Sequence, residues 1–322
     1  MNKILVMSVA VIMNAAFWFG AAHAQTYPTK PVTMIVPFAP GGTADVMGRV
    51  FGVHLAEALG QNVIFEIKAG AGSMIGSEYV ARATPDGYTI LLTGNPIAIN
   101  VALMNLAFDP RKDLTPVAGV VGFALTMVTS ASAPHKSVAD VIKASKGGHL
   151  TFGSSGPGTI SHLSGELFKS LANVDMTHVP YKGSGAVYPD LIAGRVSLLF
   201  DVSGSAIGFI KSGKVRPLAV TSSERLKALP NVPTLAEQGV SGYEALAWFG
   251  VFAPAGTPPA VVKVLEQAVN KVVQLPAFAA RLDQWGGYPL PAQSAEDFTR
   301  YYRAEVQRWE GLVREGAVKR LN

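Results

Sequence analysis

The stretch Val32-Thr-Met-Ile-Val-Pro-Phe-Ala-Pro-Gly-Gly-Thr-Ala-Asp45 predicts a strand, a glycine turn and a helix, in that order. Its β-branched apolar run ends at Pro37, two glycines follow at Gly41 and Gly42, and Thr43 begins an amphipathic helical pattern. Because glycine has no Cβ atom, the backbone of this turn can approach a ligand closely, and the N–H groups of the first helical turn would face an anion. Two interpretations stay open. The turn is a carboxylate or phosphate site, or it is an ordinary turn in which Asp45 complements the helix dipole.

Residues 1–24 have the pattern of a secretory signal peptide. Lys3 gives a positive start, the stretch from Ile4 to Gly20 is apolar apart from two polar residues, and Ala22-His-Ala24 fits the small-x-small cleavage pattern. We therefore expect export and cleavage after Ala24. The alternative is an uncleaved membrane anchor, since the apolar stretch is close to the minimum spanning length.

Composition limits the classes of function. The chain has 322 residues, which suits two medium domains, and 0 cysteines, which excludes disulfides and thiolate metal sites. The formal net charge of +5 suits an anionic ligand through long-range attraction. We expect no nucleic-acid partner, because the basic residues are dispersed and the cluster from Arg300 to Arg320 alternates with glutamates.

Short β-rich runs alternate with helical patterns along the chain, and this alternation predicts an α/β fold with two mostly parallel sheets flanked by helices. The predicted strands are Val32–Val36, Asn62–Ile67, Tyr88–Leu92, Leu125–Val128, Leu150–Phe152, Met176–Val179, Ser197–Phe200, Val215–Val220 and Phe249–Ala253. The predicted helices are Ala44–Leu59, Ser73–Ala81, Val138–Ser145, Thr159–Leu171, Ala186–Ala193, Ser205–Ser212, Pro259–Gln274, a shorter turn around Ala277–Trp285, and Ala295–Glu315. Such sheets bind ligands at the carboxyl ends of their strands.

Two further glycine-rich loops follow strands in the middle of the chain. Gly153-Ser-Ser-Gly-Pro-Gly-Thr-Ile-Ser-His162 leads into one helix, and Tyr181-Lys-Gly-Ser-Gly-Ala186 leads into another. One such loop is weak evidence for a site. Three of them, in two parts of the chain, predict a ligand cleft between two domains.

Six segments carry a family resemblance: Pro37-Phe-Ala-Pro-Gly-Gly-Thr-Ala-Asp45, Lys68-Ala-Gly-Ala-Gly-Ser-Met-Ile-Gly76, Pro85-Asp-Gly-Tyr-Thr89, Tyr181-Lys-Gly-Ser-Gly-Ala186, Phe200-Asp201 and Trp248-Phe-Gly-Val-Phe-Ala-Pro254. Together they resemble the TctC-like periplasmic solute-binding proteins of the tripartite tricarboxylate transporter system, also called the Bug family. The resemblance covers essentially the whole chain after residue 24, in order, and departs at Ser73, where the family commonly has glycine. It implies a Venus-flytrap receptor of the type II-like periplasmic-binding-protein fold. Such a receptor closes on a small carboxylate and delivers it to a membrane permease.

The resemblance also implies which residues hold the ligand, largely through backbone amides and ordered water. In the first domain they are Phe38, Gly41, Gly42, Thr43, Asp45 and Thr93. In the second domain they are Ser154, Ser155, Gly158, Thr159, Lys182, Gly183 and Asp201. We expect the first lobe to comprise residues 25–123 and 248–322 and the second lobe residues 124–247, in a periplasmic monomer without cofactor, metal ion or catalysis. The ligand candidates are dicarboxylates, tricarboxylates, amino acids and aromatic acids.

Simpler roles stay open for several of these residues. Thr159 is also placed to cap a helix, and we expect His162 to pack or cap there rather than to bind ligand. Lys182 is either a ligand partner or a solvated loop lysine. Asp201 needs a bridging donor to meet a carboxylate, so we expect it to order a loop or to accept from a ligand hydroxyl, amine or water. Trp248 and Phe249 are expected in the core rather than stacked on a ligand.

Enzymatic alternatives have weaker support. In Gly70-Ala-Gly-Ser-Met-Ile-Gly76 the third glycine falls one place late for a dinucleotide fingerprint, and no acidic residue ends the next strand. Gly153-Ser-Ser-Gly156 is not a nucleophile elbow, and metal-ligand spacings are absent from the sequence. A secreted enzyme acting on a small acid and a carboxylate sensor without a transport role remain the alternatives, together with a structural secreted protein.

Overall fold

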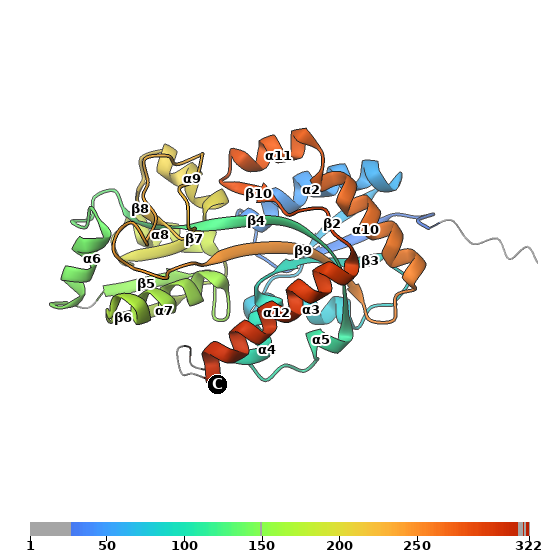
Figure 1. Cartoon of the computed structure of the whole chain (residues 1–322), viewed down its shortest axis with the longest axis horizontal. Helices are drawn as coiled ribbons and strands as arrows, with labels where there is room; N and C mark the ends of the chain where they lie inside the picture. Colours follow the sequence, from blue (N-terminus) through green and yellow to red (C-terminus); the bar gives the residue numbers. More distant parts are fainter. Residues whose placement is uncertain (1–26, 149, 315–317, 319, 322) are drawn as a thin grey trace, which may run out of the picture.

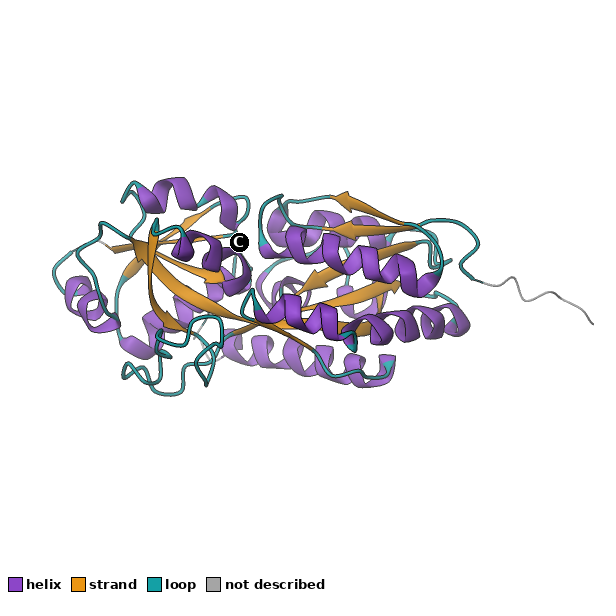
Figure 2. Cartoon of the chain, turned by 90° about the horizontal axis from the view of Figure 1, so that it is seen from above, coloured by secondary structure: helices purple, strands orange, loops and turns teal. Residues whose placement is uncertain are grey.

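The computed structural model describes residues 27–148, 150–314, 318, 320 and 321, so the predicted signal peptide lies outside the described residues. The described part is an elongated α/β molecule of two lobes, joined by long strands that run from one lobe into the other (Figures 1 and 2). Within the described ranges, no helix combines the length and the apolar character needed to cross a membrane.

The first lobe is built on a parallel unit that begins with the quoted stretch. Its strand β1 pairs in parallel with β2 on one side and with β3 on the other. The elements of this unit are β1 (Val32–Val36), α2 (Thr43–Leu59), β2 (Val63–Ile67), η2 (Ala71–Ser73), α3 (Met74–Ala81), β3 (Thr89–Gly94), α4 (Pro96–Leu103) and α5 (Pro110–Asp113). Helix α2 is capped at its C-terminus by Gly60, whose left-handed φ of 67° is a conformation that glycine adopts without a steric penalty.

Two strands connect the lobes. β4 (Leu114–Ser130) pairs antiparallel with β9 (Leu246–Pro254) as far as Ala124, and from Leu125 it pairs instead with β7 and β8. β9 also pairs with β3, and the short β10 (Gly287–Pro289) pairs with β4. The chain therefore passes between the lobes along β4 and returns at the start of β9, as Figure 1 shows.

The second lobe repeats the strand-helix pattern. Its strand β5 pairs in parallel with β6 and β7. Its elements are α6 (Val138–Ser145), β5 (Leu150–Ser154), α7 (Ile160–Ala172), β6 (Met176–Pro180), η3 (Ser184–Ala186), α8 (Tyr188–Ile192), β7 (Leu198–Val202), α9 (Ser203–Lys211) and β8 (Val215–Val220). The carboxyl ends of β5 and β6 lead into the two glycine-rich loops that the sequence singled out, and β7 leads directly into α9.

The C-terminal region returns to the first lobe. It comprises α10 (Pro259–Val273), α11 (Pro276–Asp283) and α12 (Ala295–Arg314). Helix α10 packs on α2, and α12 packs on α4 and β4. A polar contact fixes α12 beside the start of β9, because Glu305 accepts a hydrogen bond from Trp248 Nε1 at 3.1 Å.

The α/β class and every predicted strand are confirmed, but β4 is much longer than the predicted Leu125–Val128. Pro116 and the glycines in the first half of β4 are unfavourable in strand interiors, so the sequence did not predict a strand there. The observed strand is buried along almost its whole length. The sheets are mixed rather than mostly parallel, since every antiparallel pair involves β4 or β9. Helix α4 was not predicted, because its nearly all-apolar sequence has no amphipathic period.

Candidate functional site

Two adjoining cavities lie between the lobes. The inner cavity has a volume of about 60 Å³ and is lined from both lobes, by residues of the β1–α2 turn on one side and of the β5–α7 loop on the other. The outer cavity has a volume of about 340 Å³ and lies against the same two loops and the segment before α3. Both cavities lie at the carboxyl ends of β1 and β5, where ligands of open α/β sheets bind.

The wall from the first lobe is the start of helix α2. Gly42 is its N-cap residue, with extended backbone (φ −87°, ψ 172°), and no side chain caps the helix there. The Thr43 hydroxyl is buried and has no hydrogen-bond partner among the described residues. Gly42, Thr43 and Ala44 line the inner cavity, so the first N–H groups of the helix lie at its wall as donors for an anion.

Asp45 orders this turn instead of lining the cavity. Its carboxylate accepts a hydrogen bond from the Gly41 N–H at 3.0 Å and one from Arg49 Nε at 2.7 Å. Gly41 has a φ of 84°, which glycine adopts without a steric penalty. The two hydrogen bonds of Asp45 thus fix the turn that presents Gly42 and Thr43.

The wall from the second lobe is the start of helix α7. Thr159 is its N-cap, accepting from His162 N–H at 3.4 Å, and its hydroxyl donates to the Gly156 carbonyl at 2.7 Å. Ser155 donates to the Thr159 hydroxyl at 3.1 Å. Thr159 caps the helix and also lines both cavities, so its two expected roles are compatible in this geometry.

Two histidines, His162 and His178, hold the β5–α7 loop through hydrogen bonds. Ser154 Oγ shares a hydrogen bond of 2.6 Å with His178 Nε2, and the same hydroxyl accepts from the Gly156 N–H at 3.1 Å. The ring of His162 stacks on His178 at 4.0 Å, and its Nδ1 accepts from the Gly158 N–H at 3.3 Å. His162 therefore packs and holds the loop, as its sequence position predicts.

Burial lowers the pKa of both His162 and His178 to about 4, and the Lys169 charge acts in the same direction on each. Both rings are thus neutral in the folded protein at pH 7, whereas an unfolded histidine has a pKa of about 6.5. Between these values the unfolded chain binds protons that the folded chain does not, so the free energy of unfolding falls as pH falls.

We expect the protein to lose roughly 2–4 kcal/mol of stability between pH 7 and pH 4.5 through these rings. Urea unfolding at the two pH values measures the loss. His178→Gln is the control, because its amide can still bond to Ser154 but does not titrate, so its loss should be smaller. An equal loss in both proteins would contradict the assignment.

Asp201 lies at the end of β7 in the inner cavity. It is buried, and its Oδ2 accepts hydrogen bonds from the Tyr188 hydroxyl at 2.7 Å and from the Ser205 hydroxyl. Burial raises the pKa of this carboxyl above its usual range, and the hydrogen bonds oppose that shift. Asp201 therefore joins the end of β7 to α8 and to the first turn of α9, and it places a carboxyl group at the cavity wall.

The remaining predicted residues fall into two groups. Lys182 is exposed and lines the outer cavity, while Gly183 lines both cavities. Within the described part of the chain, five predicted residues line neither cavity: Gly41, Asp45, Thr93, Ser154 and Gly158. Thr93 is fully buried in β3 beside β9.

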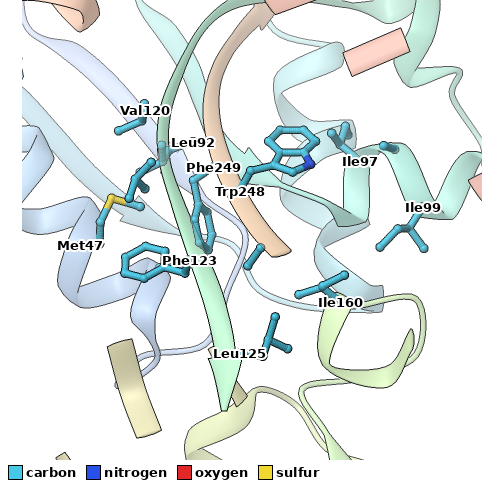
Figure 3. Close-up of a cluster of buried hydrophobic side chains, with 14 of the residues drawn as sticks. Met47, Leu92, Ile97, Ile99, Val120, Phe123, Leu125, Ile160, Trp248 and Phe249 are labelled. Carbon is cyan, nitrogen blue, oxygen red and sulfur yellow. The ribbon is translucent and has the colours of Figure 1, made fainter. Parts of the chain in front are cut away.

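Sequence reasoning missed part of the cavity wall. Trp248 and Phe249 belong to the core, as expected, yet they also line the inner cavity, together with Asn95, Ile160 and Ser184. Phe249 meets Phe38 edge-on at 5.8 Å between ring centres. Figure 3 shows Trp248 and Phe249 near the start of β9, with Phe123 on one side and Ile97 on the other. The Trp248–Pro254 segment of the resemblance was the signal for this wall.

The lobes touch across the cleft, and glycines make the contact possible. A Cβ atom at Gly158 would lie 1.8 Å from Asn100 Oδ1, and one at Gly183 would lie 2.9 Å from Ala39 Cβ. Gly72 likewise meets Pro157, where a Cβ would lie 2.5 Å from the carbonyl oxygen. The structure is therefore a closed arrangement of the two lobes.

Two α/β lobes joined by crossing strands, with opposed glycine-rich loops at their interface, define the class of periplasmic-type solute-binding proteins. The chain belongs to the tripartite tricarboxylate transporter family receptors, whose family model matches residues 47–318.

Individual relatives agree with this membership. Protein BugT of Bordetella pertussis is 37% identical over 326 residues, covering 99% of each chain. Rpa4515 of R. palustris, solved with adipate, is 35% identical, with a TM-score of 0.87 over 92% of this chain and 100% of that chain. MatC (Rpa3494) of Rhodopseudomonas palustris, solved with bound malate, is 33% identical, with a TM-score of 0.84 over 89% of this chain and 100% of that chain.

Proposed function

We propose that this chain is an extracytoplasmic receptor that binds a small carboxylate between its two lobes and delivers it to a tripartite tricarboxylate-type membrane permease. The observation that carries the proposal is the start of α2 at the wall of the inner cavity, where no side chain among the described residues caps the first helical amides. The buried Thr43 hydroxyl beside them also has no partner among the described residues. Such a helix start favours an anion. The adipate and malate of its structural relatives support a carboxylate as that anion.

The contacts divide the predicted site residues by role. Phe38, Gly42, Thr43, Ser155, Thr159, Gly183 and Asp201 line the inner cavity and would touch the ligand or its waters. Gly41, Asp45, Ser154 and Gly158 shape the loops that carry those residues. Since Asp201 accepts hydrogen bonds, it would meet a ligand hydroxyl, ammonium or water rather than the carboxylate itself.

The lobe boundaries follow from the same proposal. The first lobe would comprise residues 25–123 and 248–322, and the second lobe residues 124–247. The change of β4 partner between Ala124 and Leu125, and the start of β9 at Leu246, support these limits within about two residues. We propose a monomeric periplasmic protein in which closure of the lobes is the state that the permease recognises.

A receptor without catalysis is the better-supported proposal over a secreted enzyme. The hydrogen-bonded pair of Ser154 and His178 would be the candidate nucleophile and base. Ser154 is fully buried, and among the described residues neither it nor His178 lines the inner or the outer cavity, so this pair does not face a ligand bound there.

A thermal-shift screen tests the receptor proposal. The panel would contain dicarboxylates, citrate, acidic amino acids and aromatic acids, each with its amide as a matched neutral control. A bound acid at about 100 times its Kd stabilises a protein by about 2.7 kcal/mol, so we expect the midpoint to rise by roughly 5 °C. A panel in which no acid exceeds its amide would contradict the proposal.

A further inference from the structure

The two cavities are of different size and share part of their walls. At about 60 Å³ the inner cavity is well below the roughly 300 Å³ of a pocket that encloses a drug-sized ligand. The outer cavity, at about 340 Å³, reaches that size. Both are lined by Phe38, Ala39, Ser155, Thr159 and Gly183. An acid whose carboxylate lies at the start of α2 must therefore extend into the outer cavity if its carbon chain is long.

The two cavities differ in their ionisable side chains. Among the described residues, Asp201 is the only ionisable side chain that lines the inner cavity, and Lys182 is the only charged side chain that lines the outer cavity. A second anionic group would therefore meet no cation in the lining of the inner cavity and would be attracted by Lys182 in the outer cavity. The outer cavity therefore suits the far end of a ligand with two acidic ends.

Ser73 lines the outer cavity and carries a buried hydroxyl without a partner among the described residues. The residue is 3% exposed and lines this cavity, and its Oγ has no hydrogen-bond partner within the described ranges. Its φ of 78° is left-handed, a conformation that is unfavourable for serine. A strained backbone with an unsatisfied hydroxyl is costly, and both features concentrate at ligand sites.

We propose that Ser73 and Lys182 form a second subsite that binds the distal acidic group of an elongated dicarboxylate. The inference rests on the proposed function, because the near carboxylate of the same ligand lies at the start of α2. Ser73 Oγ donates a hydrogen bond to the distal group, and the Lys182 ammonium balances its charge. Ser73 is thus the residue that distinguishes a dicarboxylate from a monocarboxylate of equal length.

Calorimetry with paired probes tests the subsite. The probes are succinate, glutarate and adipate, each paired with the monocarboxylate of the same carbon number. In the wild-type protein we expect at least one dicarboxylate to bind about tenfold more tightly than its paired monocarboxylate. In Ser73→Gly this preference should disappear, while monocarboxylate affinity and folding stability are retained, because glycine accepts the left-handed φ.

Ala71→Gly is the matched control. Ala71 has a φ of 46° in the same segment, so its replacement relieves the same kind of strain without removing a hydroxyl. It should leave the preference for dicarboxylates unchanged. Lys182→Met should reduce the preference and its dependence on salt concentration.

Each outcome has one meaning. Equal affinity for paired acids in the wild-type protein, or an unchanged preference in Ser73→Gly, would overturn the subsite and leave the receptor proposal standing. Binding of an aromatic acid with no binding of either straight-chain series would do the same. If no acid of the larger thermal-shift panel binds, the receptor proposal itself fails.

Discussion

Gly42→Val is expected to abolish carboxylate binding in a protein that still folds. The Gly42 backbone is extended, so a side chain causes no strain there. A Cβ atom would lie 3.6 Å from Ser184 Oγ and 3.9 Å from the Ala39 carbonyl oxygen, which are ordinary contacts. The two methyl groups of valine would occupy the inner cavity of about 60 Å³ and block approach to the helix amides.

We expect the affinity for the best acid of the thermal-shift panel to fall by about 100-fold or more, a loss of at least about 2.7 kcal/mol by calorimetry. Gly42→Ala is the graded control, because its single methyl fits and should retain most of the binding. Unfolding midpoints within a few degrees of the wild-type value would show that the fold is intact. An unchanged affinity in folded Gly42→Val would place the ligand elsewhere.

The β1–turn–α2 unit could be predicted from the sequence because its signals are local. The apolar run, the paired glycines and the helical period all lie within a few turns of chain, and the observed strand Val32–Val36 has the predicted limits. The role of Asp45 in the turn is equally local, since its partners are Gly41 and Arg49.

The opposite wall of the site depends on contacts that are distant in sequence. Phe249 reaches the cavity only because β9 returns beside β3, which places Gly94 opposite it. Asp201 accepts hydrogen bonds from Tyr188 of α8 and Ser205 of α9, and no period or motif in the sequence predicts these partners. Pairing between distant segments is the information that a single sequence lacks.

Helix α4 was also missed by the sequence analysis, and it matters for closure of the two lobes. Asn100 lies on this unpredicted helix in the first lobe, fully buried, and its Nδ2 donates to the Gly72 carbonyl at 3.2 Å. Its Oδ1 lies against Gly158 of the second lobe. The contact gives Gly158, which lines neither cavity, a place in the contact between the lobes.

Gly158→Ala is therefore expected to hold the lobes apart. A Cβ atom would lie 1.8 Å from Asn100 Oδ1, and Asn100 is fixed by its own hydrogen bond, so the closed arrangement is excluded. With saturating ligand, small-angle scattering should show contraction of the wild-type protein and no contraction of the variant. The variant should also bind about 100-fold more weakly, because a ligand that touches one lobe loses the contacts of the other.

Gly194→Ala separates this contact from backbone strain. Gly194 has a φ of 75°, similar to the 70° of Gly158, but no atom of the described residues lies within 4 Å of its added Cβ. Both replacements should cost about 1 kcal/mol of stability through the left-handed backbone, and only Gly158→Ala should prevent closure. Adding Asn100→Ala to Gly158→Ala removes the obstructing oxygen and should restore contraction and part of the affinity, a coupling that two independent sites would lack. If Gly158→Ala contracts as the wild-type protein does, the contact between Asn100 and Gly158 does not limit closure.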